Sequence, residues 1–167
     1  HTKHVIEHIV EAHDTSIQGV AYAPGRDEVA TCGIEETVKV WCTLRHELKY
    51  VLKGHPQDVS HVAWCNFLGG RWVTASEDES LRMWDGPEME SMMGYSGDAV
   101  TALYVDEANE VIVAAMEDRC LRVYDPRAPA GSQLVKKYLG HTDVVRSIEY
   151  VAEKRQYLTC SWDKSIR

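Results

Sequence analysis

The feature that most constrains the fold is a unit of about 40 residues that occurs four times along the chain. Each copy has a turn, an alternating apolar run, a short strand-like segment, an acidic turn and a second strand-like segment. The copy at residues 72–85, WVTASEDESLRMWD, closes with Trp84-Asp85. Related segments occupy residues 28–41, 110–125 and 155–167, and the last stops before its closing aromatic residue. Such a period is the signature of units that stack and cover one another's apolar faces.

Strands are predicted wherever apolar and polar residues alternate with period two between turn residues. Their short, even spacing leaves no room for a helix of useful length and predicts an all-β antiparallel architecture. The Pro-rich segment at residues 125–132, DPRAPAGS, is predicted to be a surface loop. The strands are predicted at residues 17–23, 28–32, 37–41, 47–52, 59–65, 72–76, 80–84, 100–105, 111–115, 120–124, 133–139, 145–151 and 156–160, with a further strand that begins at Ser165.

Residues 4–10, HVIEHIV, are predicted to form the outer strand of a preceding unit, since similar segments precede Gly54-His55 and Gly140-His141. A helix here would place His4 and His8 on one face, where two imidazoles could hold a metal. The β-branched residues in the segment favour the strand, and no further ligand pattern accompanies the two histidines. We therefore predict no metal site.

Composition limits the classes of partner. The chain of 167 residues is long enough for one domain with a real core, and its formal net charge is −8. That charge disfavours nucleic-acid binding, which relies on clustered Lys and Arg. No apolar run reaches the roughly 18 residues needed to cross a bilayer, so no membrane role is expected.

The five cysteines are odd in number and form no C-x-x-C pair. This usage predicts a reducing, intracellular compartment, here the cytoplasm, rather than a disulfide framework. The chain begins with His1 and ends inside a repeat, so we expect it to be a segment of a longer protein.

Spacing within the repeats is conserved from copy to copy. The step from His13 to Glu35 and from His141 to Asp163 is 22 residues, and from His55 to Asp78 it is 23. These units resemble WD repeats. The residues that fit the family pattern are Gly54-His55, Ser76, Asp78 and Trp84-Asp85 in one repeat, and Gly140-His141, Ser161 and Asp163 in another. The resemblance covers essentially the whole chain.

The resemblance implies a β-propeller of four-stranded antiparallel blades, with about four blades present. Because seven blades are usual in that family, the chain is expected to be a segment of a larger propeller. One propeller domain is predicted over residues 1–167, with repeats at about 13–52, 55–93, 96–139 and 141–167, the last one truncated.

The resemblance also implies a buried hydrogen-bonded chain of His, Ser, Asp and Trp in each blade. Buried polar groups need such partners, because each orphan costs roughly 1–3 kcal/mol. The first repeat departs from the pattern with Gly33 and Glu35, and the third with Ser96, Met116 and Tyr124, so these two are expected to rely more on packing. The residues predicted to form the network are His55, Ser76, Asp78, Trp84, His141, Ser161 and Asp163.

A neighbouring His, Ser and Asp also invite interpretation as a hydrolase triad. That chemistry requires an exposed nucleophile on a strained turn, and the sequence contains no G-x-S-x-G element. It also lacks a P-loop, a dinucleotide-binding glycine pattern and an EF-hand loop. We therefore predict no catalysis and no cofactor.

The remaining functional candidate is the surface. By resemblance, loops on two rigid faces would bind proteins or peptides as a scaffold in a multiprotein complex, for example a cytoskeletal or ciliary one. As an alternative, the Tyr124–Arg127 segment resembles the motif by which some WD-repeat proteins dock as substrate receptors on a cullin–RING ubiquitin ligase adaptor, with Arg127 as the key contact. The candidate partner-binding residues are Glu77, Glu79, Asp98, Glu117, Arg119, Asp125 and Arg127.

Overall fold

The computed structural model describes residues 11–95 and 97–167. The predicted strand at residues 4–10, the His4 and His8 pair and Ser96 lie outside this part of the chain. The described residues form 14 strands and no helix, so the all-β prediction is confirmed.

Three four-stranded antiparallel sheets follow one another along the chain, each with its strands in sequence order. The first contains β1 (Ile17–Ala23), β2 (Glu28–Gly33), β3 (Thr37–Cys42) and β4 (Glu47–Lys53). The second contains β5 (Val59–Cys65), β6 (Arg71–Ser76), β7 (Ser80–Asp85) and β8 (Glu88–Tyr95). The third contains β9 (Val100–Asp106), β10 (Val111–Met116), β11 (Leu121–Tyr124) and β12 (Leu134–Tyr138).

The fourth sheet contains two described strands, β13 (Val145–Val151) and β14 (Gln156–Ser161). A bridge between Cys160 and Ile166 adds the start of a third antiparallel segment to β14. The repeat pattern therefore produces one sheet for each sequence unit.

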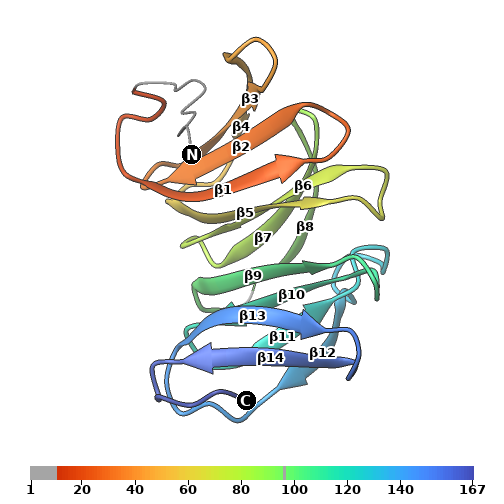
Figure 1. Ribbon diagram of the computed structural model, residues 1–167. Helices are drawn as coiled ribbons and strands as arrows, with labels where there is room; N and C mark the ends of the chain where they lie inside the picture. The colour runs from red at the N-terminus through yellow and green to blue at the C-terminus, as the bar shows by residue number, and fades with distance from the viewer. Residues whose placement is uncertain (1–10, 96) are drawn as a thin grey trace, which may run out of the picture.

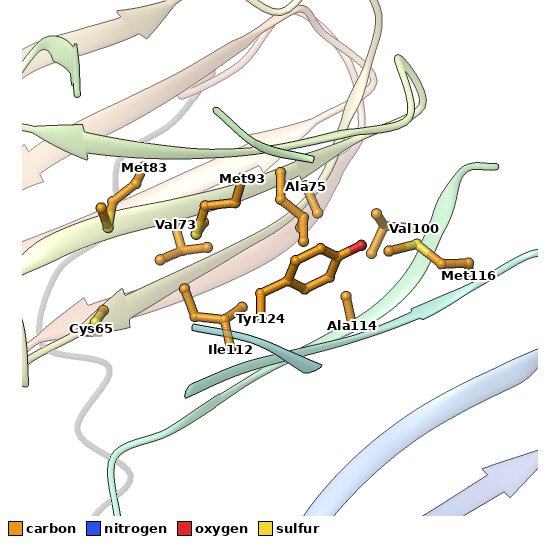
Figure 2. Close-up of a cluster of buried hydrophobic side chains, with 11 residues drawn as sticks. Cys65, Val73, Ala75, Met83, Met93, Val100, Ile112, Ala114, Met116 and Tyr124 are labelled. Carbon is orange, nitrogen blue, oxygen red and sulfur yellow. The ribbon is translucent and has the colours of Figure 1, made fainter. Parts of the chain in front are cut away.

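The sheets stack face to face, with β1 near one end of the stack and β13–β14 at the other (Figure 1). The first strand of each sheet contacts the first strand of the next, in the order β1, β5, β9, β13. The core consequently lies between sheets, in three successive apolar clusters. Figure 2 shows the cluster between the second and third sheets, where Tyr124 lies among Met83, Met93 and Ile112.

The same repeat positions supply the core at every step of the stack. Three residues of each sheet, two on its second strand and one on its third, pack on the first strand of the following sheet. Burying side chains of this size stabilises the fold by about 1.5–3 kcal/mol each for Val or Leu. These residues are Ala30, Cys32 and Val38 in the first sheet, Val73, Ala75 and Leu81 in the second, and Val113, Ala115 and Leu121 in the third.

Polar contacts also join neighbouring sheets. The Glu107 carboxylate accepts the backbone N–H groups of Asn66 at 2.6 Å and Phe67 at 3.1 Å, which joins a turn of the second sheet to one of the third. The Tyr157 hydroxyl donates to Asp106 Oδ2 at 2.6 Å and joins the fourth sheet to the third. The turns on this side of the stack are therefore held at fixed relative positions.

Candidate functional site

A buried hydrogen-bonded chain crosses the second sheet from its turn to its third strand. The Trp84 indole N–H donates to Thr74 Oγ1 at 2.9 Å, and Thr74 Oγ1 lies 2.7 Å from His55 Nε2. On the other side of the ring, His55 Nδ1 lies 2.9 Å from Asp78 Oδ2. The side chains come from the loop before β5, from β6, from the β6–β7 turn and from β7.

The donors and acceptors of this chain assign the protonation of His55. The Asp78 carboxylate only accepts, so the ring proton of His55 lies on Nδ1 and donates to it. In the neutral ring Nε2 then accepts from the Thr74 hydroxyl, which in turn accepts from the indole N–H. Burial lowers the pKa of His55, which favours the same neutral form, although Asp78 opposes the shift. Burial alone would raise the pKa of Asp78, but hydrogen bonds from Ser80 and His55 outweigh it and lower that pKa. A neutral imidazole beside a carboxylate is thus the resting state.

The middle link of the chain is Thr74, which the sequence analysis missed, rather than Ser76. The Ser76 hydroxyl instead donates to the Gln57 carbonyl at 3.2 Å and accepts the Asp78 backbone N–H at 3.1 Å. Both side chains lie on the same face of β6, because residues two apart on a strand point the same way. Ser76 pairs with Val59 at the end of the strand, whereas Thr74 pairs with Val62 further in, within reach of the indole.

The first sheet carries an equivalent chain. Trp41 Nε1 donates to Thr31 Oγ1 at 2.8 Å, and His13 Nε2 lies 2.6 Å from the same oxygen. Glu35 Oε2 takes the place of the aspartate, 3.2 Å from His13 Nδ1, where the geometry does not make a hydrogen bond. We expected this repeat to rely more on packing because Gly33 stands at the serine position, but the polar chain is present, since its link is Thr31.

The fourth sheet repeats the His and carboxylate part. His141 Nε2 lies 2.8 Å from Thr159 Oγ1, and His141 Nδ1 lies 2.7 Å from Asp163 Oδ2. Ser161, like Ser76, is outside this chain and donates to a backbone carbonyl, that of Asp143, at 2.9 Å. The hydroxyl that contacts the Nε2 atom of the histidine is a threonine in all three sheets.

The aspartates also shape the turns that carry them. Asp78 Oδ1 accepts the backbone N–H of Ser80 at 3.0 Å, and Asp163 Oδ1 accepts that of Ser165 at 2.8 Å. In both turns the residue after the aspartate has a left-handed backbone, with φ of 67° at Glu79 and 66° at Lys164. A short Asx side chain favours such a turn because it bonds to the backbone two residues on.

The third sheet lacks the neutral chain but keeps an Asp–Arg ion pair that the second sheet also has, where Arg82 Nη2 lies 3.1 Å from Asp78 Oδ2. Ala114 occupies the threonine position and carries no hydroxyl, and Tyr124 occupies the tryptophan position. Asp118 instead binds Arg122 through two contacts of 2.9 and 2.6 Å and Lys137 through one of 3.2 Å. Although burial opposes it, these cations hold the pKa of Asp118 well below its usual range.

Comparison with known proteins accounts for this pattern. The family model described as WD domain, G-beta repeat matches residues 5–42, 46–85 and 132–167, which is more than half of the chain. The chain belongs to the WD40 repeat family. The segment that the model leaves unmatched, residues 86–131, contains most of the sheet that lacks the His, Thr and Trp chain.

Several WD40-containing relatives carry the name Ribosome biogenesis protein WDR12 homolog. The one from Drosophila erecta is 27% identical over 161 residues, which cover 84% of this chain and 37% of the relative. The one from Anopheles gambiae is 24% identical over 175 residues, which cover 92% of this chain and 40% of the relative. The chain thus spans about two fifths of the length of these relatives.

A solved structure shows the same fold. The crystal structure of the computationally designed Ika4 protein superposes with a TM-score of 0.79 at 19% identity, covering 94% of this chain and 92% of that one. With the WD40 matches and the stacked antiparallel sheets, this likeness confirms the propeller prediction.

The WD40 blades place the predicted partner-binding residues on two sides. Glu77, Glu117 and Arg119 are exposed in the turns between the second and third strands, and Glu79 and Asp98 are partly buried near them. The backbone at Arg119 is left-handed, with φ of 69°, and its guanidinium donates to the Thr142 carbonyl at 3.1 Å. This side therefore gathers carboxylates on turns of repeated geometry.

Asp125 and Arg127 lie at the opposite ends of the strands. Arg127 Nε donates to Asp125 Oδ1 at 2.9 Å, and its Nη1 pairs with Glu110. The hydrogen bonds from Arg127 lower the pKa of Asp125. The Arg127 side chain is about half exposed and already neutralised within its own blade.

Other kinds of site have little support. Ser76, His55 and Asp78 are all buried, so no substrate reaches the His, Ser and Asp set of the second blade. Across residues 11–95 and 97–167, no group of three or more His, Cys, Asp or Glu residues is placed to hold a metal ion. The same residues include no helix long and apolar enough to span a membrane.

Proposed function

We propose that this chain is a non-catalytic platform that binds other proteins within an assembly that takes part in ribosome biogenesis. The observation that carries the proposal is the combination of WD40 blades with a His, Ser and Asp set in the second blade, His55, Ser76 and Asp78, that is buried and hydrogen-bonded within the protein. The relatives' shared name supports ribosome biogenesis over the cytoskeletal or ciliary assembly suggested by the sequence alone. An intracellular, cytoplasmic location remains a prediction.

In this proposal the partner binds the side of the stack that carries Glu77, Glu117 and Arg119, in the turns between the second and third strands of the sheets. Its turns are held by Asp side chains and by contacts such as the one between Arg119 and Thr142, so little entropy is lost when a partner binds. The exposed carboxylates of Glu77 and Glu117, in a chain of net charge −8, favour a basic protein segment. The same negative charge disfavours direct contact with the phosphates of RNA.

The test is affinity purification of the native, tagged protein from its own cells, with and without ribonuclease. We expect ribosome-assembly proteins to co-purify and to resist ribonuclease treatment. The double variant Glu77→Gln/Glu117→Gln should lower their recovery about tenfold, because electrostatic complementarity steers and holds the complex.

The matched control is Glu88→Gln/Glu153→Gln, which makes the same charge change at exposed residues on the other side of the stack, at the start of β8 and in the β13–β14 turn. Loss of the partners in this control but not in the test variant would contradict the choice of face. Loss on ribonuclease treatment would show that RNA makes the contact. An Arg127→Ala variant that loses a ubiquitin-ligase adaptor from the bound fraction would establish the alternative function.

A further inference from the structure

A basic residue stands four positions after the acidic residue of the turn in every repeat. In the first two sheets it forms an ion pair with that acidic residue. Lys39 Nζ lies 3.7 Å from Glu35 Oε2, and Arg82 Nη2 lies 3.1 Å from Asp78 Oδ2. The second sheet contacts a neighbouring sheet on each side, so its contacts are those of an internal blade. The four basic residues are Lys39, Arg82, Arg122 and Arg167, which follow Glu35, Asp78, Asp118 and Asp163.

The same basic residue also reaches the loop that leads into its own sheet. In the second sheet, Arg82 Nη1 donates to the carbonyl of Gly54, which stands directly before the histidine of the polar chain. In the first sheet, Lys39 Nζ donates at 2.9 Å to the carbonyl of Ala12, the residue at the equivalent position. In both sheets one side chain therefore joins the loop before the first strand to the turn between the second and third strands.

The guanidinium of Arg82 makes a further contact on the turn. Its Nε donates to Ser80 Oγ at 3.1 Å, in addition to the contacts with Gly54 and Asp78. A planar guanidinium presents its N–H donors in a fixed fork, so it holds several partners at set relative positions. The Arg82 side chain is 13% exposed, and solvent therefore competes little for these contacts.

The backbone at Gly54 shows how closely the guanidinium approaches the loop. Its φ is 149°, and a Cβ at this residue would lie 3.1 Å from Arg82 Nη1. The same pairing recurs in the fourth sheet, where a Cβ on Gly140 would lie 3.6 Å from Arg167 Nη1. The first sheet, whose basic residue is a lysine, has Ala12 at this position. The glycine before the histidine thus accompanies an arginine that packs on it.

The loop and the turn that Arg82 joins both lie on the side of the stack where partner binding is proposed. The Glu77 backbone N–H donates to the Asp58 carbonyl at 3.0 Å, which ties the far end of the loop to the turn. Arg82 ties the near end. Residues 56–57, between these two attachments, are exposed, as is Glu77.

We propose that Arg82 is a positioning residue for partner binding, whose guanidinium fixes the loop at residues 53–58 on the turn at residues 76–80. The exposed side chains of these two segments then meet a partner in a single arrangement, which reduces the ordering that binding requires. Arg82 acts through the two segments, because its own side chain is largely covered. The inference rests on the proposed function, in which a protein binds this side of the stack.

The variants Arg82→Gln and Arg82→Lys, made in the native, tagged protein, test the role of the guanidinium. In Arg82→Gln, hydrogen exchange measured by mass spectrometry should become about tenfold faster in peptides that cover residues 53–58 and 76–80. Recovery of the co-purifying proteins should fall about fivefold, because the two segments no longer keep one arrangement.

Arg82→Lys should restore most of the protection and of the recovery, since Lys39 makes the equivalent contacts in the first sheet. A side chain that only stabilised the fold would change the melting temperature without a binding loss that lysine restores. Circular dichroism checks that both variants keep their strand content.

The matched control is Arg71→Gln, which removes an arginine of similar exposure from the same sheet. Arg71 lies at the start of β6, at the end of the strand opposite the turn. Its side chain is 19% exposed and pairs with Asp85 at 3.2 Å and with Glu90 at 2.6 Å. This variant should leave both the exchange of the two segments and the recovery of partners unchanged.

Three results would overturn the proposal. Exchange in the two segments could stay the same in Arg82→Gln. Arg71→Gln could lose as much partner as Arg82→Gln does, which indicates a general effect of charge or stability. Arg82→Lys could lose as much as Arg82→Gln.

Failure of the proposed function would look different. The unchanged protein would then recover no ribosome-assembly proteins, and the role of Arg82 in binding would fall with it. The exchange measurement needs no partner, so it would still decide whether Arg82 fixes the loop on the turn.

Discussion

The second and third sheets share one apolar cluster, and each pairs the aspartate of its turn with an arginine four residues on, but the rest of the polar contacts differ. In the second sheet, neutral groups form a chain from Trp84 through Thr74 to His55, which ends at Asp78, and Asp78 also pairs with Arg82. In the third sheet that neutral chain is absent, and Asp118 pairs with Arg122 and with Lys137. Both sheets have the same strand order and lie in the same stack, so the chain of neutral hydrogen bonds is not what specifies this fold.

The two sheets differ in which side chains occur together at the tryptophan and threonine positions. An indole N–H in the third sheet would face Ala114, which cannot accept a hydrogen bond, whereas the ring of Tyr124 packs among apolar side chains. The threonine, the histidine and the tryptophan therefore occur together or are replaced together. The WD40 family model matches residues 46–85, which carry this set, and not residues 86–131, which lack it.

The largest effect should come from Thr74→Val. This change keeps the shape of the side chain but leaves the Trp84 indole N–H and His55 Nε2 without partners inside the protein. Two such orphans should lower the free energy of unfolding by about 3 kcal/mol, measured by urea denaturation. Ser76→Ala is the control and should cost about 1 kcal/mol, because its hydroxyl bonds only to backbone groups at the end of the strand. A larger cost for Ser76→Ala would show that the serine is the main link after all.

A smaller effect should follow Asp118→Asn in the third sheet. The buried Arg122 would lose its carboxylate partner, so we expect a loss of about 2 kcal/mol, less than for a fully buried pair because Asp118 is partly exposed. Hydrogen exchange should show this as reduced protection in β10–β12, with β6 and β7 unaffected. Glu117→Gln, at the neighbouring exposed residue, should change stability by less than about 0.5 kcal/mol. Equal losses in the two variants would mean that the ion pairs contribute nothing specific.

The smallest effect should be a pH dependence that separates the two sheets. Burial lowers the pKa of His55 from 6.5, so the unfolded chain binds more protons at mildly acidic pH. Stability of the second sheet should therefore fall as the pH drops through about 6.5, by at most about 1.4 kcal/mol per unit. Hydrogen exchange at about pH 7.5 and about pH 5.5 should show this loss in β5–β8, while the third sheet, whose Asp118 stays ionised, keeps its protection.

His61 provides the control for that measurement, because it lies on β5 and burial lowers its pKa too. Both histidines should contribute, so the pH dependence should become smaller in His55→Asn and in His61→Gln and disappear only in the double variant. An unchanged pH dependence in His55→Asn would assign the titration to His61 and leave the hydrogen-bonded chain without a part in it.

Most of the fold was predictable because strand alternation and the repeat act together. The strands β1, β5 and β13 begin and end at the residues that the alternation predicts. The strand β8, EMESMMGY, was not predicted as an element, since its residues do not alternate and methionine has no strong strand preference. Its place comes from pairing with β7, a tertiary contact.

Less of the candidate site than of the fold could be predicted from the sequence. The histidine and carboxylate pairs could be read from their spacing, but Thr74 and Ser76 lie on the same side of β6 and differ only in depth along it. Cross-strand register decides between them, and it includes an irregularity between Val59 and His61 that a pattern does not reveal. The Asp118, Arg122 and Lys137 cluster was missed for a similar reason, because Lys137 reaches Asp118 from another strand.

The repeated use of the same apolar positions at each step has a consequence for how such a gene can change. An in-frame duplication or deletion of one unit joins faces that already fit, since Ala30, Val73 and Val113 perform the same task in successive units. The length of the array can therefore evolve without new complementary surfaces. The turns, which lie outside these positions, are free to diverge and to acquire new recognition chemistry while the scaffold beneath them is copied unchanged.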